Sequence, residues 1–88
     1  MVNTILRLPE VLRERGRSRS SHYKDIQLGL FTRQVSIGLR SVGWPSTEVE
    51  AINAARIAGI SDDDIRSLVV FLESARKTAS LGGDYHGN

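Results

Sequence analysis

The first third of the chain contains a short segment in which hydroxyl, amide and basic side chains recur at helical spacing. In a helix, His22 and Ile26 share one face, which we expect to turn inward. Ser20, Lys24 and Gln27 then share the opposite face. Side chains of these types form hydrogen bonds with base edges and with phosphates. The spacing therefore predicts contacts to duplex nucleic acid.

Two arginines extend this candidate surface. Arg19 lies in the first turn of the same predicted helix, where it can bond a guanine with two donors or clamp a phosphate beside the helix amides. Arg40 lies at the tip of a predicted hairpin, from which it can reach a phosphate or the adjacent minor groove. The complete set of candidate contacts is Arg17, Arg19, Ser20, Ser21, Tyr23, Lys24, Gln27, Arg33, Arg40 and Ser41.

Structural roles compete with contact roles at several positions. Arg19 can instead form a surface ion pair with Glu10 or Glu14. Tyr23 can belong to the core, and His22 fits a partly buried packing role better than the role of a ligand. Three further arginines are expected to be solvated, with a phosphate contact open to the last of them: Arg13, Arg15 and Arg17.

The basic residues are concentrated at one end of the sequence. The chain has 12 Lys and Arg against 10 Asp and Glu, a net charge of +2. Eight of the basic residues precede Ser41, whereas seven of the acidic residues follow Arg40. A polyanion-binding face with a neutral or repelled back has this separation. Small proteins also acquire uneven charge by chance, so charge alone leaves both interpretations open.

The residue types present exclude several kinds of site. The 88 residues include no cysteine, which removes disulfides, zinc knuckles and thiol nucleophiles. Asp62, Asp63 and Asp64 are adjacent on a predicted helix, so they point about 100° apart and do not converge on one ion. Neither a phosphate-binding glycine loop nor a Ser-His-Asp set on rigid elements is present. We therefore expect no enzyme, no cofactor and no metal.

Membrane insertion is also not expected. The sequence has no apolar run that approaches the roughly 20 residues that span a bilayer. We expect a single small domain over residues 1–78, in a cytoplasmic, nucleoid-associated protein.

Caps and glycines indicate the elements that position the candidate contacts. Pro9 suits the first turn of a helix over residues 9–15, and Gly16 suits the left-handed position after its end. Ser18 can cap a second helix over residues 19–28 by accepting from the amides of its first turn. Two short helices joined around a glycine form a helix-turn-helix.

A hairpin and a third helix follow. Alternating apolar and small residues over 35–44 predict a small two-stranded wing, with Trp44 as its anchor in the core. Ser46 or Thr47 can then cap a helix over residues 46–58. The predicted fold class is mainly α: a winged helix-turn-helix with additional C-terminal helices.

The last predicted helix covers residues 61–77, with Ser61 as its N-cap. Its apolar residues Ile65, Leu68, Val69 and Leu72 form one stripe. Val70 and Phe71 widen that stripe, so they can contact another copy of the chain, or the whole helix can cover its own core. We expect residues 79–88 to form a flexible tail.

Four segments together form a recognisable pattern of residues and spacing. They are Ile5-Leu-Arg-Leu-Pro-Glu-Val-Leu, Gly16-Arg-Ser-Arg-Ser-Ser-His-Tyr, Val42-Gly-Trp and Ser46-Thr-Glu-Val-Glu-Ala. Together they resemble the AlpA family of phage-type regulators, over residues 6–58. The family's fold is a winged helix-turn-helix, related to MerR-type DNA-binding domains and to many excisionases. The chain departs from the family pattern at Arg17 and His22, where apolar residues are usual. It departs again at Thr32-Arg33-Gln34, where prolines usually flank a basic residue.

The resemblance implies sequence-specific binding to double-stranded DNA of a mobile genetic element. Family members activate transcription of an integrase or related gene, or act as recombination directionality factors. In the second role they bind and bend attachment-site DNA so that a tyrosine recombinase excises the element. The implied partners are attachment-site or promoter DNA, a tyrosine-family integrase and further copies of the chain on DNA.

Two other functions stay open. A protein-interaction module could use the helix-turn-helix only as a scaffold and inhibit or recruit a partner without DNA. RNA binding is a weaker third option, because aromatic residues make up only 6% of the chain and few are available to stack on bases.

Overall fold

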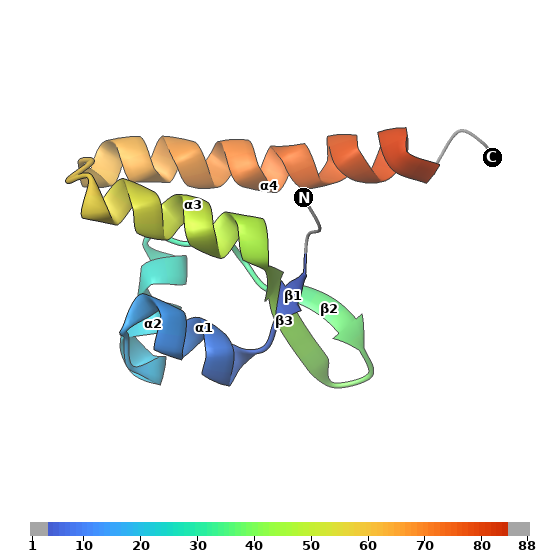
Figure 1. The fold of residues 1–88 in the computed structure, drawn as a ribbon, viewed down its shortest axis with the longest axis horizontal. Coiled ribbons are helices and arrows are strands. Elements are labelled where there is room, and N and C mark those ends of the chain that lie inside the picture. Colours follow the sequence, from blue (N-terminus) through green and yellow to red (C-terminus); the bar gives the residue numbers. More distant parts are fainter. Residues whose placement is uncertain (1–3, 85–88) are drawn as a thin grey trace.

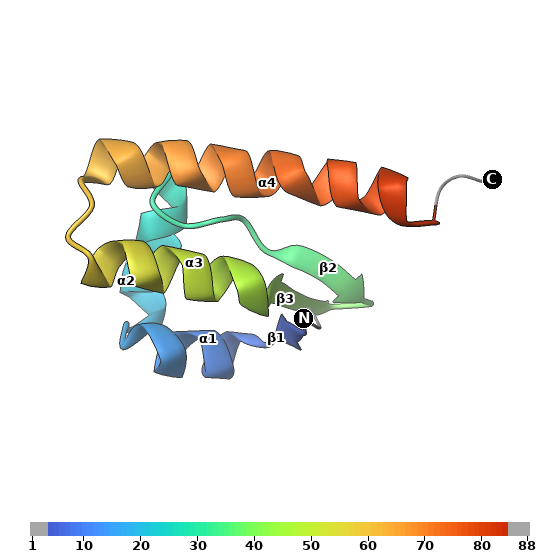
Figure 2. The same cartoon turned by 45° about the horizontal axis from the view of Figure 1, so that its top comes forward.

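The computed structural model describes residues 4–84, with side chains described through residue 77. Its elements are, in chain order, β1 (Ile5–Leu6), α1 (Leu8–Arg15), α2 (Arg19–Gln27), β2 (Val35–Gly38), β3 (Ser41–Pro45), α3 (Ser46–Ile57) and α4 (Asp62–Asp84). The helix α3 lies between α4 on one side and α1 on the other (Figures 1 and 2). The hairpin of β2 and β3 projects from the side of the molecule that also carries α1 and α2 (Figure 1).

The expected fold class is confirmed: the chain is mainly α, with a helix-turn-helix and a wing. The helices differ from expectation in the cap of α3 and in the length of α4. The helix α3 begins at Ser46 with Pro45 as its N-cap, so neither Ser46 nor Thr47 caps it. The helix α4 continues to Asp84, so residues 79–84 are helical where we expected a flexible tail. Residues 85–88 of that expected tail lie outside the described residues.

The sheet has one strand more than the predicted wing. Its three antiparallel strands are in the order β1-β3-β2, with Leu6 opposite Trp44 and Val35 opposite Gly43. The additional strand is β1, which forms an antiparallel ladder along the other edge of β3. Gly43 permits this close approach, because a Cβ there would lie 2.8 Å from the carbonyl oxygen of Leu6. Pairing with β1 therefore fixes the base of the wing.

The core lies where the helices meet the base of the wing. Its fully or nearly buried apolar residues are Val11, Leu30, Phe31, Trp44, Val49, Ile52, Ile65 and Val69. The indole Nε1 of Trp44 donates to the backbone oxygen of Thr32 at 2.9 Å, so its polar group is satisfied in the interior. Trp44 is therefore the anchor that the sequence predicted.

Polar contacts fasten α4 to the rest of the domain. Arg76 donates to both carboxylate oxygens of Glu48 in α3, at 2.6 and 2.7 Å, and to the backbone oxygen of Arg33. Glu73 accepts from the backbone amide of Arg33 at 2.7 Å. The inner face of α4 thus covers the domain's own core, which is one of the two roles expected for this helix. Within residues 4–84, no helix combines the length and the apolar character that a bilayer crossing requires.

Candidate nucleic-acid interface

The helix-turn-helix forms around Gly16. This residue has φ 65° and ψ 35°, the left-handed conformation that glycine adopts without a side-chain clash. The amide of Arg17 then donates to the oxygen of Leu12 and closes the end of α1. Ser18 caps α2, since its hydroxyl accepts from the amide of Ser21 at 3.2 Å. These contacts direct α2 away from the axis of α1 within three residues, as predicted.

A buried ion cluster joins the two helices. The carboxylate of Asp25, on the inner face of α2, accepts from Arg15 at 2.8 Å and from Arg17 at 2.8 and 3.1 Å. The side chains of Arg15 and Asp25 are only 4% and 6% exposed. We expected Arg15 to be solvated, and this was wrong. Its guanidinium carbon lies 4.1 Å from the ring centroid of Phe31, so the arginine is also part of the packed interior.

His22 completes this cluster. Its Nδ1 lies 2.8 Å from Nη1 of Arg15, and because a guanidinium only donates, Nδ1 accepts and Nε2 carries the hydrogen. Nε2 is buried without a hydrogen-bond partner among the described residues. Burial and the neighbouring Arg15 lower the pKa of His22 to about 4, so its ring is neutral at pH 7. Burial also lowers the pKa of Arg15, and the hydrogen bond with Asp25 opposes that shift.

The outer face of α2 presents the side chains that the spacing predicted. Arg19, Ser20, Lys24 and Gln27 are exposed, whereas His22 is fully buried. None of these four outer side chains forms a hydrogen bond or ion pair with another side chain in residues 4–77. The alternative ion pair between Arg19 and Glu10 or Glu14 is therefore not formed there. The donors of the outer face are available to a ligand.

Other candidate contacts have partners inside the domain. Arg17 uses Nε and Nη2 on Asp25, although its side chain is 42% exposed. The Ser21 hydroxyl accepts from the hydroxyl of Ser18 at 3.0 Å. Tyr23 is half-buried against the core, and its hydroxyl lies 3.5 Å from Oε1 of Gln34. For these positions the internal role is visible and a contact with nucleic acid stays a prediction.

The wing and the segment before it carry the remaining candidates. Arg40 is exposed in the turn between β2 and β3, with φ 64°. Ser41 is half-buried at the first position of β3. The side chain of Arg33 is 78% exposed and lies 3.4 Å from Glu73, a weak surface pair that a phosphate could replace.

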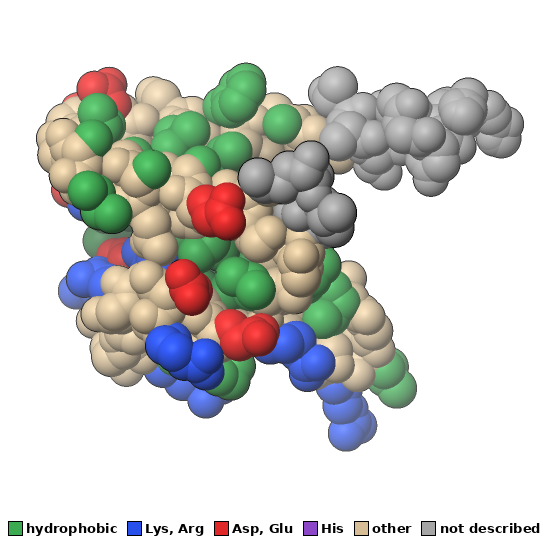
Figure 3. Space-filling view, viewed as in Figure 1, with side chains coloured by type: hydrophobic (Ala, Val, Ile, Leu, Met, Phe, Trp, Pro, Cys, Tyr) green, Lys and Arg blue, Asp and Glu red, His purple; other side chains and the backbone are tan. Residues whose placement is uncertain are grey.

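Ion pairs within residues 4–77 leave the unpaired cations mainly in the first half of the chain. Three arginines of the second half are paired with acids: Arg56 with Asp62, Arg66 with Asp63, and Arg76 with Glu48. In the first half, the cations without such a pair in residues 4–77 include Arg13, Arg19, Lys24 and Arg40. Lys and Arg side chains gather along the lower edge of the molecule, over α1, α2 and the wing, whereas α3 and α4 show mainly apolar and uncharged surface (Figure 3). On the face shown, the basic side chains therefore lie apart from α4, although the end of α2 reaches α4, where Gln27 and Val70 line one pocket.

The acidic residues at the start of α4 have structural roles. Ser61 caps the helix by accepting from the amide of Asp64 at 3.2 Å, as predicted. Asp62 and Asp63 each accept from an arginine, and in the described part of the chain no group of three His, Cys, Asp or Glu side chains could hold a metal ion.

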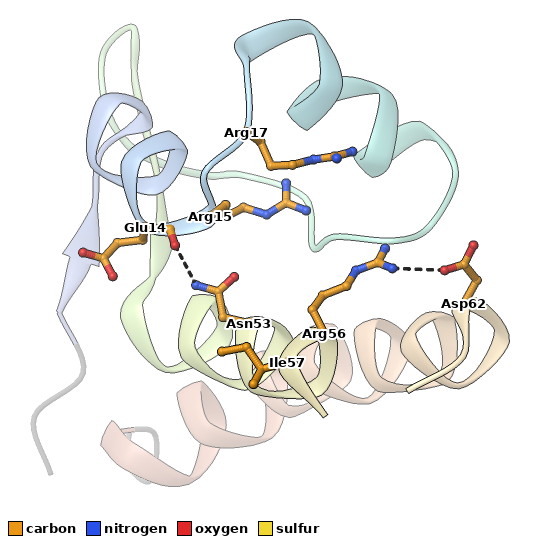
Figure 4. Close-up of a pocket in the computed structure, with 7 residues that line it drawn as sticks. All are labelled: Glu14, Arg15, Arg17, Asn53, Arg56, Ile57 and Asp62. Carbon is orange, nitrogen blue, oxygen red and sulfur yellow. Dashed lines mark hydrogen bonds and ion pairs between the residues drawn. The ribbon is translucent and has the colours of Figure 1, made fainter. Parts of the chain in front are cut away.

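A pocket of about 490 Å³ lies between α1 and α3, lined by Glu14, Arg15, Arg17, Asn53, Arg56, Ile57 and Asp62. Three guanidinium groups border it, and Figure 4 shows the pair between Arg56 and Asp62 and the amide of Asn53 donating to the backbone oxygen of Glu14. Arg15 and Arg17 share the single carboxylate of Asp25, and Arg56 is paired with Asp62. Glu14 also lines the pocket, so acidic groups surround the three guanidinium groups and a small anion is not favoured there.

Two features of this surface were not predicted from the sequence. The first is the Arg15–Asp25–Arg17 cluster, although an acid three residues after His22 on the inner face of α2 is a detectable signal. The second is the exposure of Leu39, whose side chain is 92% exposed beside Arg40. The signal there is an apolar residue in a hairpin turn, where polar residues are usual.

The fold and this surface define a small winged helix-turn-helix protein with a basic face. The family model described as prophage CP4-57 regulatory protein (AlpA) matches residues 4–57, and the chain belongs to this family of phage regulatory proteins. An uncharacterized protein, ORF88, of Enterobacteria phage P4 is 50% identical over 54 residues, which are 61% of this chain. The chain matches 61% of the length of that relative. No solved structure is significantly similar to the chain.

Proposed function

We propose that this protein binds double-stranded DNA with sequence specificity, by placing α2 in the major groove and the wing against the adjacent backbone and minor groove. The observation that carries the proposal is the outer face of α2. Arg19, Lys24 and Gln27 are exposed there without side-chain partners among residues 4–77, on a helix whose inner face is fixed by a buried ion cluster. A recognition helix of this kind contacts bases with its N-terminal residues.

The remaining contacts follow from that placement. Arg40 reaches a phosphate or the minor groove beside the α2 site. Arg33 leaves its weak pair with Glu73 for a phosphate, and the amides at the start of α2 hold another. Arg17, Ser21, Tyr23 and Ser41 border this surface, with a phosphate contact for the exposed part of Arg17.

We infer that the DNA belongs to a mobile element, in keeping with the family of phage regulators to which the chain belongs. The protein acts there as a recombination directionality factor that organises attachment-site DNA for a tyrosine-family integrase, as a transcriptional regulator, or as both. It works in the cytoplasm, on the nucleoid. Neither role requires chemistry from the protein, so we propose no catalytic activity.

Footprinting on the DNA around its own gene, any neighbouring integrase gene and the ends of the element tests this proposal. Protection of several regularly spaced direct repeats at an attachment site, lost with Lys24→Ala, supports the excision role. Protection confined to a promoter supports the regulatory role. No protection at low salt contradicts DNA binding, because phosphate contacts are strongest there.

A second candidate function rests on the exposed apolar side chains of α4. Val70 and Phe71 on α4 are 64% and 66% exposed. This apolar surface suits a protein partner. In the DNA-binding proposal that partner is a neighbouring copy on DNA, and in the alternative it is a different protein that is inhibited or recruited without DNA. The alternative predicts that Phe71→Ser abolishes function and that Lys24→Ala does not.

A further inference from the structure

Leu39 is the most exposed large apolar side chain in the described part of the chain, at 92%. It lies at the end of the wing, in a two-residue turn with Arg40, between the paired residues Gly38 and Ser41. Two residues before it, Ile37 is 39% exposed. The far end of the wing therefore presents apolar side chains next to a cation, and Figure 3 shows both kinds there.

Local stability favours neither residue of this turn. Arg40 has φ 64°, and in residues 4–84 it is the non-glycine residue with a positive φ. A turn that needs φ above zero at its second central position is best served by glycine or asparagine. An apolar side chain that is fully in water contributes nothing to the core at the first position. Residues that break local rules at an exposed tip indicate a function that requires them.

We propose that Leu39 inserts between two base pairs from the minor groove and kinks the duplex beside the α2 site, with Arg40 bonding a flanking phosphate. This inference rests on the proposed DNA binding and adds to it a means of bending. Apolar wedges on proteins that approach the minor groove act in this way, because partial unstacking opens space for an aliphatic side chain. The neighbouring arginine supplies the charge complementarity that holds the wedge against the backbone.

The wing has the rigid base that a wedge needs. The strand β3 is hydrogen-bonded to β2 on one edge and to β1 on the other. Its residue Trp44 is fully buried and bonded to the backbone of Thr32. A load on Leu39 is therefore transferred through β3 to the core. The hairpin can then resist displacement when a base step opens.

The test compares three variants of the full chain with the wild type on the footprinted DNA site: Leu39→Ser, Leu39→Phe and Ile57→Ser. Ile57 is a matched control because it is 87% exposed but lies on α3, outside the wing. The duplex carries dyes at both ends for energy transfer, which reports bending. In separate duplexes, 2-aminopurine replaces one adenine at a time, and its fluorescence rises where a base is unstacked.

We expect the wild type, Leu39→Phe and Ile57→Ser to shorten the end-to-end distance and to brighten 2-aminopurine at one step. Leu39→Ser should lose most of both signals while its affinity falls by about tenfold or less. Equal bending and brightening by Leu39→Ser overturns the wedge alone, as does wild-type binding without any rise in fluorescence. If the wild type does not bind DNA at low salt, the proposed function and the wedge are both overturned.

Discussion

The guanidinium of Arg15, the last residue of α1, lies 2.8 Å from the carboxylate of Asp25 in α2, and both side chains are almost fully buried. This pair fixes the angle between the two helices of the helix-turn-helix. Because Asp25 also accepts from Arg17, and His22 accepts from Arg15, one polar cluster holds the inner face of α2, whereas the outer face is exposed.

Breaking the pair between Arg15 and Asp25 should destabilise the domain strongly. Asp25→Asn leaves a buried guanidinium without a counter-ion, and the expected loss is about 3–5 kcal/mol in the free energy of unfolding. A domain of this size has little stability to spare, so the variant should be largely unfolded. Urea denaturation followed by circular dichroism measures the loss. Asp63→Asn is the control, because Asp63 is 92% exposed and its pair should contribute less than about 1 kcal/mol. A loss below about 1 kcal/mol for Asp25→Asn would contradict the role of the cluster.

Stability should fall in mildly acidic solution because of His22. Its pKa is about 4 in the folded protein against 6.5 for the ordinary side chain, so the unfolded chain binds the proton more readily. The free energy of unfolding therefore decreases as the pH falls from about 6.5 to about 4, by up to roughly 3 kcal/mol. Thermal denaturation over this range should show a flatter profile for His22→Gln. An NMR titration of His22 with a midpoint near 6.5 would rule out this explanation.

Lys24→Ala should weaken DNA binding and reduce its salt dependence. If the ammonium contacts a phosphate, the slope of log affinity against log salt should become less steep by about 1. Fluorescence anisotropy at several salt concentrations measures both quantities. Arg56→Ala is the matched control, because Arg56 is paired with Asp62 away from α2. Equal effects of the two substitutions would count against α2 as the recognition helix.

Arg40→Gly should raise the stability of the protein and weaken its binding to DNA. Glycine accepts φ 64° without strain, so the substitution should stabilise the protein by about 1 kcal/mol. It also removes the cation of the wing and should weaken DNA binding. Arg40→Ala, which loses the charge but keeps the strain, should weaken binding without the gain in stability. Tighter DNA binding by Arg40→Gly would mean that the wing does not contact the backbone.

Changing the outer face of α4 should affect assembly and leave the fold intact. Val70 and Phe71 are both mostly exposed, so the double substitution to serine should change the free energy of unfolding by less than about 1 kcal/mol. We expect it to reduce cooperativity on DNA that carries several sites, with little effect on a single site. Quantitative footprinting compares the two substrates. Unchanged cooperativity would exclude this face as the contact between copies.

The sequence by itself determined where α1, α2 and the hairpin lie and which face of α2 is polar. Gly16 and Ser18 mark the turn between helices through backbone requirements that are local, and the periods of 3.6 and 2 distinguish helix from strand. The same periodicity predicted that His22 faces inward and that Lys24 and Gln27 face outward. These features depend on residues within one or two turns of each other, so no distant contact was needed to predict them.

Only the tertiary structure decided which charges are free. Arg15, Arg17 and Arg19 alternate along one short segment and look equivalent in the sequence. The first two contact Asp25, whereas the third has no ion pair within the described side chains. The pairing of β1 with β3 likewise joins residues about 40 positions apart. A side chain's partner depends on where separate elements meet, and that meeting is set by the packing of the whole core around Trp44 and Ile52. Helix caps and hydrophobic periods depend on neighbouring residues and can be predicted from them. The two partners of an ion pair come from separate elements, so neighbouring residues do not predict them.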